Sequence, residues 1–232
     1  MSGREGFTLR IPDEAGTKTF RYQDVIERFL QDHNLKGIVA FSGGLDPKDP
    51  DAERKASDLL HAMLGGLNAN HFAVQTGGTK WGIPFLGNLA ARNQNMKTIG
   101  VYPRRGRKHA LPPDLLDLAI EVGPFAVRPG TPDEEHGQWG DESPVFASLA
   151  DVMVVIGGGP GAEAEVSLAM KRNGGGVRPT VVVPVLGSGG IADLLLVIAE
   201  AIYPNASHFL KPVTSADEVK EIIMSHIPYS KG

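Results

Sequence analysis

The chain has 232 residues, of which 41% are hydrophobic and 22% are charged. These proportions match soluble globular proteins and exclude a disordered or collagen-like chain, and the length predicts one large domain or at most two small ones. The formal net charge of −4 disfavours a generally basic nucleic-acid-binding protein.

The residue types also exclude several kinds of site. With no cysteine, the chain has no disulfide framework, thiolate nucleophile or cysteine zinc site. No two histidines have the spacing of a metal site, so we expect no metal. The charged N-terminal segment and the shortness of the apolar runs predict a cytoplasmic protein without a membrane partner.

Residues 1–35 are predicted to be an embellishment that precedes the main domain. Within them, 7–11 and 18–22 flank a turn-rich DEAG sequence typical of a small hairpin. Residues 23–32 have a short helical pattern. We expect residues 36–232 to form a single domain.

From residue 38 onward, short apolar runs alternate with helical patterns. Runs rich in Val and Ile are typical of parallel strands buried on both faces, and apolar spacings of three and four residues indicate helices between them. The predicted strands are 38–42, 72–76, 98–102, 152–156, 180–185 and a short one at 206–210; the predicted helices are 52–67, 82–94, 144–150, 160–172, 190–202 and a capped one from Ser215 to about His226.

This alternation predicts an α/β fold: a Rossmann-like, doubly wound, mostly parallel sheet with helices on both faces. Ligands of such sheets bind beyond the carboxyl ends of the strands. Residues 191–202 are apolar nearly all round, which predicts a buried helix and a homodimer or larger closed oligomer.

Glycine supplies 29 residues, and many of them follow the predicted strands. Glycine lets a ligand approach the main chain, and a helix N-terminus offers free N–H donors. We therefore expect these turns to cradle phosphates; the plainer alternative is a set of tight strand-to-helix turns. The candidate ligand-binding residues in the clusters are Ser42, Gly43, Gly44, Thr76, Gly77, Gly78, Thr79, Lys80, Gly82, Gly157, Gly158, Gly159, Gly161, Gly187, Ser188 and Gly189.

Basic and aromatic residues near the same edge have two interpretations each. The basic run 104–109 follows a strand, so it either contacts phosphate or an acidic partner or is an exposed loop; no RNA-binding motif accompanies it, and a nucleic acid is not expected. Lys80 either meets a diphosphate or is solvated, and Trp81 either stacks on a base or plugs the sheet edge. The candidates from this region are Pro103, Arg104 and Arg105.

Known phosphate-binding fingerprints match poorly. Thr79-Lys80 lacks the glycine spacing of a P-loop. Gly157, Gly159 and Ala162 satisfy a relaxed dinucleotide fingerprint, but the acidic residue expected about 20 positions later is absent. Neither a Walker nucleotidase nor a dehydrogenase is expected.

Several segments, in order along the chain, resemble the SLOG superfamily. This Rossmann-like fold is shared by the LOG enzymes, once called lysine-decarboxylase-like, and by the N-terminal region of TRPM channels, and the likeness is closest to the TRPM-type branch and its prokaryotic relatives. The segments are VAFSGGL (39–45), VQTGGTKWGIPFLGNLA (74–90), TIGVYP (98–103), GGGPGAEAEV (157–166) and PVLGSGGIADLL (184–195).

The resemblance implies binding of a nucleotide or nucleotide-sugar such as AMP, ADP-ribose or an NAD-related metabolite, with no required cofactor. Glu165 matches the glutamate that helps LOG enzymes cleave an N-glycosidic bond, and it is our catalytic candidate. The LOG threonine is replaced by Ala162, and the LOG arginine falls at Glu142, which puts catalysis in doubt. The alternatives are a LOG-type nucleotide N-glycosidase and a molybdenum-cofactor-carrier-like protein.

Overall fold

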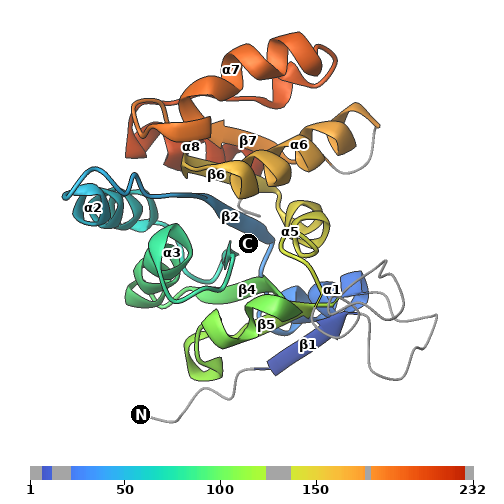
Figure 1. The fold of residues 1–232 in the computed structure, drawn as a ribbon. Helices are drawn as coiled ribbons and strands as arrows, with labels where there is room; N and C mark the ends of the chain where they lie inside the picture. Colours follow the sequence, from blue (N-terminus) through green and yellow to red (C-terminus); the bar gives the residue numbers. More distant parts are fainter. Residues whose placement is uncertain (1–6, 12–21, 124–136, 176–178, 228–232) are drawn as a thin grey trace.

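A computed structural model describes residues 7–11, 22–123, 137–175 and 179–227. Seven strands, all parallel, form one sheet with helices on both faces (Figure 1). The predicted α/β, Rossmann-like fold is therefore confirmed.

The sheet reverses its direction of growth once. From β2 the chain adds β3, β4 and β5 on one side, then returns to place β6 and β7 on the other, so the switch point lies between β2 and β6. The order is β1-β5-β4-β3-β2-β6-β7. The strands are β1 (Phe7–Ile11), β2 (Gly37–Gly44), β3 (Phe72–Thr76), β4 (Lys97–Pro103), β5 (Leu118–Val122), β6 (Val152–Gly157) and β7 (Val181–Pro184).

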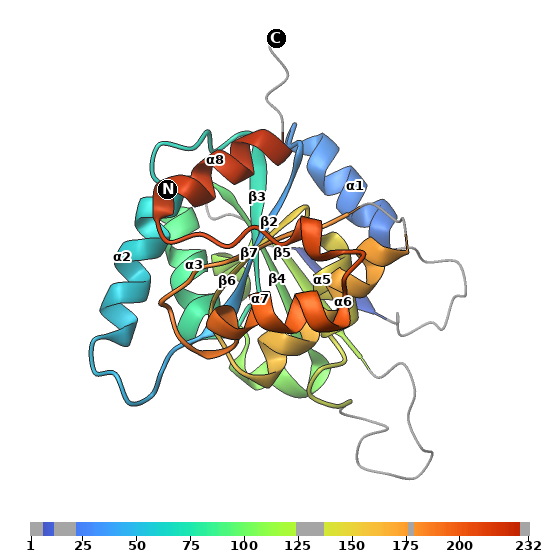
Figure 2. The same ribbon diagram turned by 90° about the horizontal axis from the view of Figure 1, so that it is seen from above.

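The helices pack on the two faces in separate groups (Figure 2). One group contains α2 (Ala52–Leu64), α3 (Gly82–Asn93) and α8 (Ala216–His226). The other contains α1 (Tyr22–Asp32), α5 (Ser143–Leu149), α6 (Pro160–Gly174) and α7 (Gly190–Ile202). Short 3-10 segments are η1 (Arg104–His109), η2 (Pro113–Leu115) and η3 (Ser207–Phe209).

The apolar runs are continuous because both faces of the strands are covered. Along β2, Val39 and Phe41 pack with the α2, α3 and α8 side, whereas Ile38 and Ala40 pack with the opposite side. Since successive strand residues point to opposite faces, a strand in this position needs apolar residues at every position.

Two elements differ from the sequence prediction. We did not predict β5, because its five residues include an acidic one, Glu121. Residues 206–210 are wrongly predicted as a strand: they contain η3, and only Leu210 forms a parallel bridge, to Val182.

The N-terminal strand belongs to the main sheet. Residues 7–11 pair in parallel with β5, with Phe7 beside Leu118 and Ile11 beside Val122, so this segment forms a sheet edge. Most of the second arm of the expected hairpin falls in 12–21, outside the described residues. The division into 1–35 and 36–232 stays a prediction.

Helix α7 has an apolar outer face. Its inner side is buried through residues such as Ile191 and Leu195, while Val197 is 72% exposed and Ile202 is 62% exposed. The expected oligomer stays a prediction. Among the described helices, none combines the length and the apolar character that a membrane span requires.

Candidate functional site

Three glycine-bearing turns meet at the switch point of the sheet. Strands β2 and β6 end together, with Gly44 beside Gly157, and the turn after β7 lies against them because the Gly157 N–H donates to Ser188 Oγ (2.8 Å). Together these turns line a hollow of about 570 Å³, which we call the glycine hollow. Its lining residues are Gly44, Leu45, Asp46, Pro47, Asp49, Gly157, Gly158, Gly159, Gly187, Ser188, Gly189 and Gly190.

Some of these glycines are explained by packing of the backbone alone. Gly43 has φ +147°, and a Cβ there would clash with the carbonyl oxygen of Ile156. A Cβ on Gly157, which has φ +58°, would clash with the carbonyl oxygen of Gly44. At these positions the strand ends approach so closely that only glycine fits.

Two glycines have no such explanation. Gly159 and Gly161 flank the first residue of α6, Pro160, and neither has a positive φ. A Cβ added to either one would meet no atom within 4 Å. Both residues are exposed. Neither packing nor backbone strain therefore requires glycine here.

The N-terminus of α6 offers backbone donors at this point. The first amide that bonds back along the chain is that of Glu163, which donates to the Gly159 carbonyl (3.0 Å). The N–H groups of Gly161 and Ala162 precede it and have no partner within the helix. Gly159, the residue at the N-cap position, makes no side-chain hydrogen bond to this end. Two amides and the positive end of the helix dipole are thus available to an anion.

The turn after β7 is different, because the chain supplies its own anion. The Asp193 carboxylate accepts the N–H groups of Gly187 (2.6 Å) and Gly189 (3.1 Å). Asp193 lies in the first turn of α7. We expected these amides to bind a ligand phosphate; the carboxylate already satisfies them.

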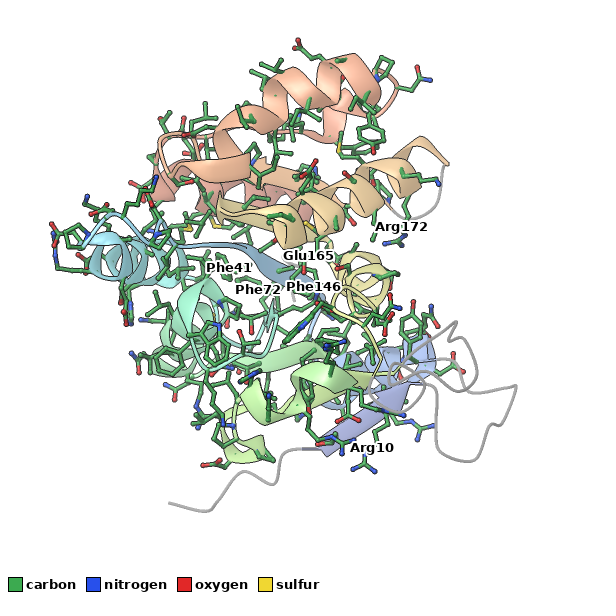
Figure 3. All side chains as sticks on the ribbon, viewed as in Figure 1. Arg10, Phe41, Phe72, Phe146, Glu165 and Arg172 are labelled. Atoms are coloured by element: carbon green, nitrogen blue, oxygen red, sulfur yellow. The ribbon has the colours of Figure 1, made fainter. Side chains whose placement is uncertain are left out.

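A second, smaller cavity lies on the other side of the α6 N-terminus. It measures about 160 Å³ and we call it the acidic cavity. Figure 3 labels Glu165, Phe41 and Phe146, all of which contribute to its wall. Its lining residues are Phe41, Ser42, Gly43, Gly77, Thr79, Pro84, Pro103, Trp139, Glu142, Phe146, Gly161, Ala162 and Glu165.

Glu165 is the most perturbed titratable group of this cavity. Burial raises its pKa to about 8, the neighbouring Glu142 carboxylate adds to the shift, and a hydrogen bond from Ser42 Oγ to Glu165 Oε2 (2.5 Å) opposes it. Burial also raises the pKa of Glu142. At neutral pH Glu165 therefore holds a proton, and the two carboxyl groups do not both carry a full charge.

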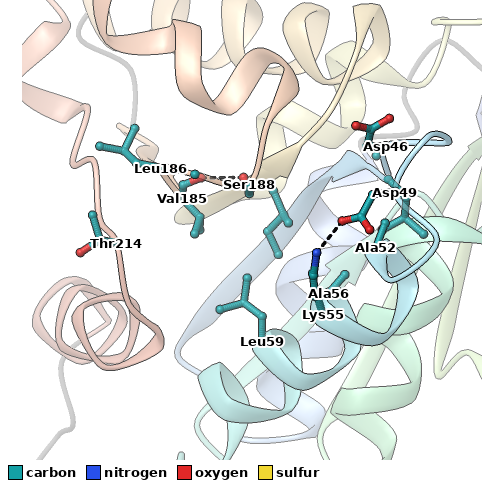
Figure 4. A pocket seen from close by; sticks show the side chains of 14 residues that line it. Asp46, Asp49, Ala52, Lys55, Ala56, Leu59, Val185, Leu186, Ser188 and Thr214 are labelled. Atoms are coloured by element: carbon teal, nitrogen blue, oxygen red, sulfur yellow. Dashed lines mark hydrogen bonds and ion pairs between the residues drawn. The ribbon is translucent and has the colours of Figure 1, made fainter.

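The outer wall of the glycine hollow is acidic. Asp46 and Asp49 line it, and they also line an adjoining hollow of about 290 Å³ that Figure 4 shows. Lys55 lines that adjoining hollow, where its Nζ pairs with Asp49 (2.8 Å), and this bond holds the pKa of Asp49 below its usual value. Across the part of the chain that the structure describes, no three His, Asp or Glu side chains are grouped as metal ligands.

The cations expected to neutralise phosphate are engaged elsewhere. Lys80 is exposed, and its Nζ donates to the Lys108 carbonyl (3.3 Å). Arg104 Nε lies 3.5 Å from Oε1 of Glu121, a buried carboxylate on β5. Arg105 is exposed. None of the three lines the glycine hollow or the acidic cavity.

Glu121 explains why the basic run turns away from the hollow. Its side chain is 2% exposed and accepts two hydrogen bonds from Arg107, both 2.5 Å long. Arg10 on β1 lies 3.9 Å away. The run therefore folds as η1 against β5, where it compensates a buried charge.

The other candidates divide between the cavity wall and the turn structure. Gly77, Thr79 and Pro103 line the acidic cavity. Thr76 Oγ1 accepts the Gly78 N–H (3.2 Å), which shapes the turn after β3, and Gly82 begins α3 with φ +64°. Trp139 also lines this cavity, and it was not among our candidate residues.

The family comparison agrees with the sequence resemblance. Residues 36–226 match the family described as "SLOG in TRPM, prokaryote". The match therefore covers β2 to α8 with both cavities. No protein of curated function matches the sequence significantly.

Solved structures share the fold at low identity. The crystal structure of TM1055 is 19% identical with a TM-score of 0.61, over 82% of this chain and 99% of that one. A molybdenum cofactor binding protein from Rippkaea orientalis is 22% identical with a TM-score of 0.56, over 83% and 98%. The molybdenum cofactor carrier protein of Chlamydomonas reinhardtii is 18% identical with a TM-score of 0.57, over 83% and 98%.

The family match spans most of the chain, and the arrangement of the strands agrees with it. The chain belongs to the SLOG family, in the prokaryotic group related to the SLOG region of TRPM proteins.

Proposed function

We propose that this protein binds a nucleotide or nucleotide-sugar across the carboxyl edge of its sheet, with the phosphate at the N-terminus of α6. The glycine hollow, about 570 Å³, has the size of a small-molecule site, for which volumes of about 300–1,000 Å³ are typical. It lies at the switch point, where ligands of doubly wound sheets bind.

The observation that carries the proposal is the pair Gly159 and Gly161. A side chain at either position would fit the protein without strain or contact. A ligand that must reach the amides of the first turn supplies the reason for glycine at both.

The charged side chains among the described lining residues are acidic, so a phosphate here would be held by backbone groups rather than by side-chain cations. Asp46 and Asp49 line the hollow, and the nearby Lys55 is neutralised by Asp49. Attraction for an anion must then come from the α6 amides and dipole, which are worth about 0.3–2 kcal/mol for each favourable charge. We therefore expect modest affinity for phosphate alone, with further contacts to the rest of the ligand.

Isothermal titration calorimetry with AMP, ADP-ribose, NAD and inorganic phosphate tests the proposal. Gly159→Asp places a carboxylate at the mouth of the helix N-terminus and should reduce affinity at least about tenfold, a change of about 1.4 kcal/mol. Gly174→Asp, at the exposed opposite end of α6, is the control and should bind normally. Equal binding by both variants, or binding by neither the wild type nor the variants, would overturn the proposal.

Glu165 favours a second candidate function, cleavage of a nucleotide N-glycosidic bond. A carboxyl group with a pKa of about 8 keeps the proton that a general acid gives to a departing base. Release of free base from AMP, detected by chromatography, would support this function if it disappears in Glu165→Gln. Bound but intact AMP would favour simple binding.

The molybdenum cofactor proteins among the structural relatives suggest a third ligand. The phosphate of a pterin would accept hydrogen bonds from the α6 amides in the same way as the phosphate of a nucleotide. Mass spectrometry of the small molecule that copurifies with the protein separates these ligands.

A further inference from the structure

The two tryptophans of the chain are both exposed and lie on either side of one histidine. Trp81 is 54% exposed and Trp139 is 58% exposed. The His109 ring is 4.9 Å from Trp81, edge to face, and 6.4 Å from Trp139 with an interplanar angle of 19°. Large aromatic groups left in water at one place are typical of a binding surface.

The two rings differ in their relation to the acidic cavity. Trp139 lines the acidic cavity, while Trp81 does not. The Trp139 ring packs close to η1: a Cβ added to Gly106 of η1 would be 3.3 Å from Cζ3 of Trp139. One side of the indole is thus supported by protein, and much of the rest is exposed.

The turn that carries Trp139 is held by the cavity's own carboxylate. Glu142 Oε2 accepts the Gly140 N–H (3.0 Å), and Asp141 Oδ2 accepts the Gln138 N–H (2.7 Å). Glu142 therefore both lines the cavity and fixes the residue after the indole. An aromatic surface and a carboxyl group stand at the same opening.

The size and polarity of the acidic cavity limit what can enter. A volume of about 160 Å³ is below the range for whole small-molecule sites, so it suits one ring system. Among its described lining residues the ionisable groups are Glu142 and Glu165, and none of these residues is cationic. An ionised carboxylate only accepts hydrogen bonds, so the ring edge that faces Glu142 should present N–H donors.

We infer that the acidic cavity receives the ring of the ligand, a 2-amino-4-oxopyrimidine such as occurs in guanine and in pterins, stacked on Trp139 with its N–H edge facing Glu142. The inference rests on the proposed function, because the phosphate of the same ligand would lie at the α6 N-terminus. That helix end borders both cavities, through Gly159 on one side and Gly161 on the other.

The ring chemistry follows from donor counting. The 2-amino-4-oxopyrimidine edge has an N–H and an amino group side by side, which match the two oxygens of one carboxylate. Adenine offers a single amino group beside acceptor nitrogens. The cavity therefore favours guanine or a pterin over adenine.

Fluorescence of single-tryptophan variants tests the stacking. Trp81→Phe leaves Trp139 as the only indole, and Trp139→Phe leaves Trp81. Titration with GMP, AMP and neopterin monophosphate should change the emission of Trp81→Phe in a saturable way and leave the emission of Trp139→Phe nearly unchanged. Signals confined to Trp81 would overturn the inference.

Calorimetry distinguishes the contribution of the ring to the affinity from the contribution of the phosphate. Trp139→Ala should weaken GMP and neopterin monophosphate about tenfold, as expected for loss of one stacked ring, whereas Trp81→Ala should bind normally. Glu142→Gln should weaken the same two ligands by about tenfold or more and AMP much less. The affinities for GMP and for neopterin monophosphate show whether a nucleotide or a pterin is preferred.

The failures of the two proposals are distinguishable. Suppose that AMP binds as tightly as GMP and neopterin monophosphate, that Gly159→Asp weakens AMP binding and that Trp139→Ala leaves AMP binding unchanged. The ring assignment is then wrong and the phosphate site stands. If none of the three ligands binds the wild type, both proposals are wrong.

Discussion

The substitution Gly161→Ala tests whether glycine is needed at this position for folding or for ligand binding. Gly161 is the second residue of α6, is exposed, and has no atom within 4 Å of an added Cβ. Alanine in place of glycine stabilises a helix by about 0.5–1 kcal/mol. In a chain of this length that gain raises the melting temperature by about 1–4 °C.

The same methyl group should reduce ligand binding. It would stand beside the amides that we assign to the phosphate and at the wall of the acidic cavity. We expect affinity for GMP or AMP to fall at least about tenfold, or by about 1.4 kcal/mol. The variant is thus expected to be more stable and less able to bind.

Differential scanning fluorimetry and calorimetry on one preparation measure both effects. Gly174→Ala is the matched control, since it lies in the same helix, is exposed and also has no atom within 4 Å of an added Cβ. It should gain stability and keep full affinity. A destabilised Gly161→Ala protein, or one that binds like the wild type, would refute the reasoning.

Two further predictions concern buried carboxyl groups. The folded state raises the pKa of Glu165 from 4.5 to about 8. Its contribution to the free energy of unfolding is therefore complete below pH 4.5 and is lost as the pH rises through about 8, with a slope of up to about 1.4 kcal/mol per pH unit. Glu165→Gln should remove this pH dependence in urea titrations from pH 5 to 9, and an unchanged pH profile would contradict the assignment. Glu121→Gln removes the buried charge and leaves the partly exposed Arg104 and Arg107 beside a neutral amide. The loss of charge-assisted hydrogen bonds should cost about 1.5–3 kcal/mol in urea unfolding, whereas a loss below about 1 kcal/mol would mean that the carboxylate does not anchor the basic run.

The fold was predictable because its signals are local. Five of the seven strands appear as short apolar runs, and the capping box at Ser215 and Glu218 marks the start of α8 as predicted. Strand β5 escaped because Glu121 interrupts its apolar pattern, and the arginines that compensate that charge come from other elements. A buried charge that is compensated by residues far away in the sequence leaves no periodic pattern in the sequence of its own strand.

The candidate site was predictable in part for the same reason. The turns after β2, β6 and β7 were expected at one edge, and they meet there. The sequence could not show that Asp193 fills the amides after β7, because a carboxylate in the first turn of a helix is also typical of an ordinary dipole interaction. It also could not pair Glu142 with Glu165 by spacing; only the family resemblance placed them together.

Backbone amide shifts in nuclear magnetic resonance spectra test the central claim most directly. Titrating isotope-labelled protein with GMP or AMP should move the amide signals of Gly159, Gly161 and Ala162 in a saturable way. Those of the run 171–174, at the opposite end of α6, should change little. Large shifts in that run with unmoved signals at the start of α6 would contradict the account.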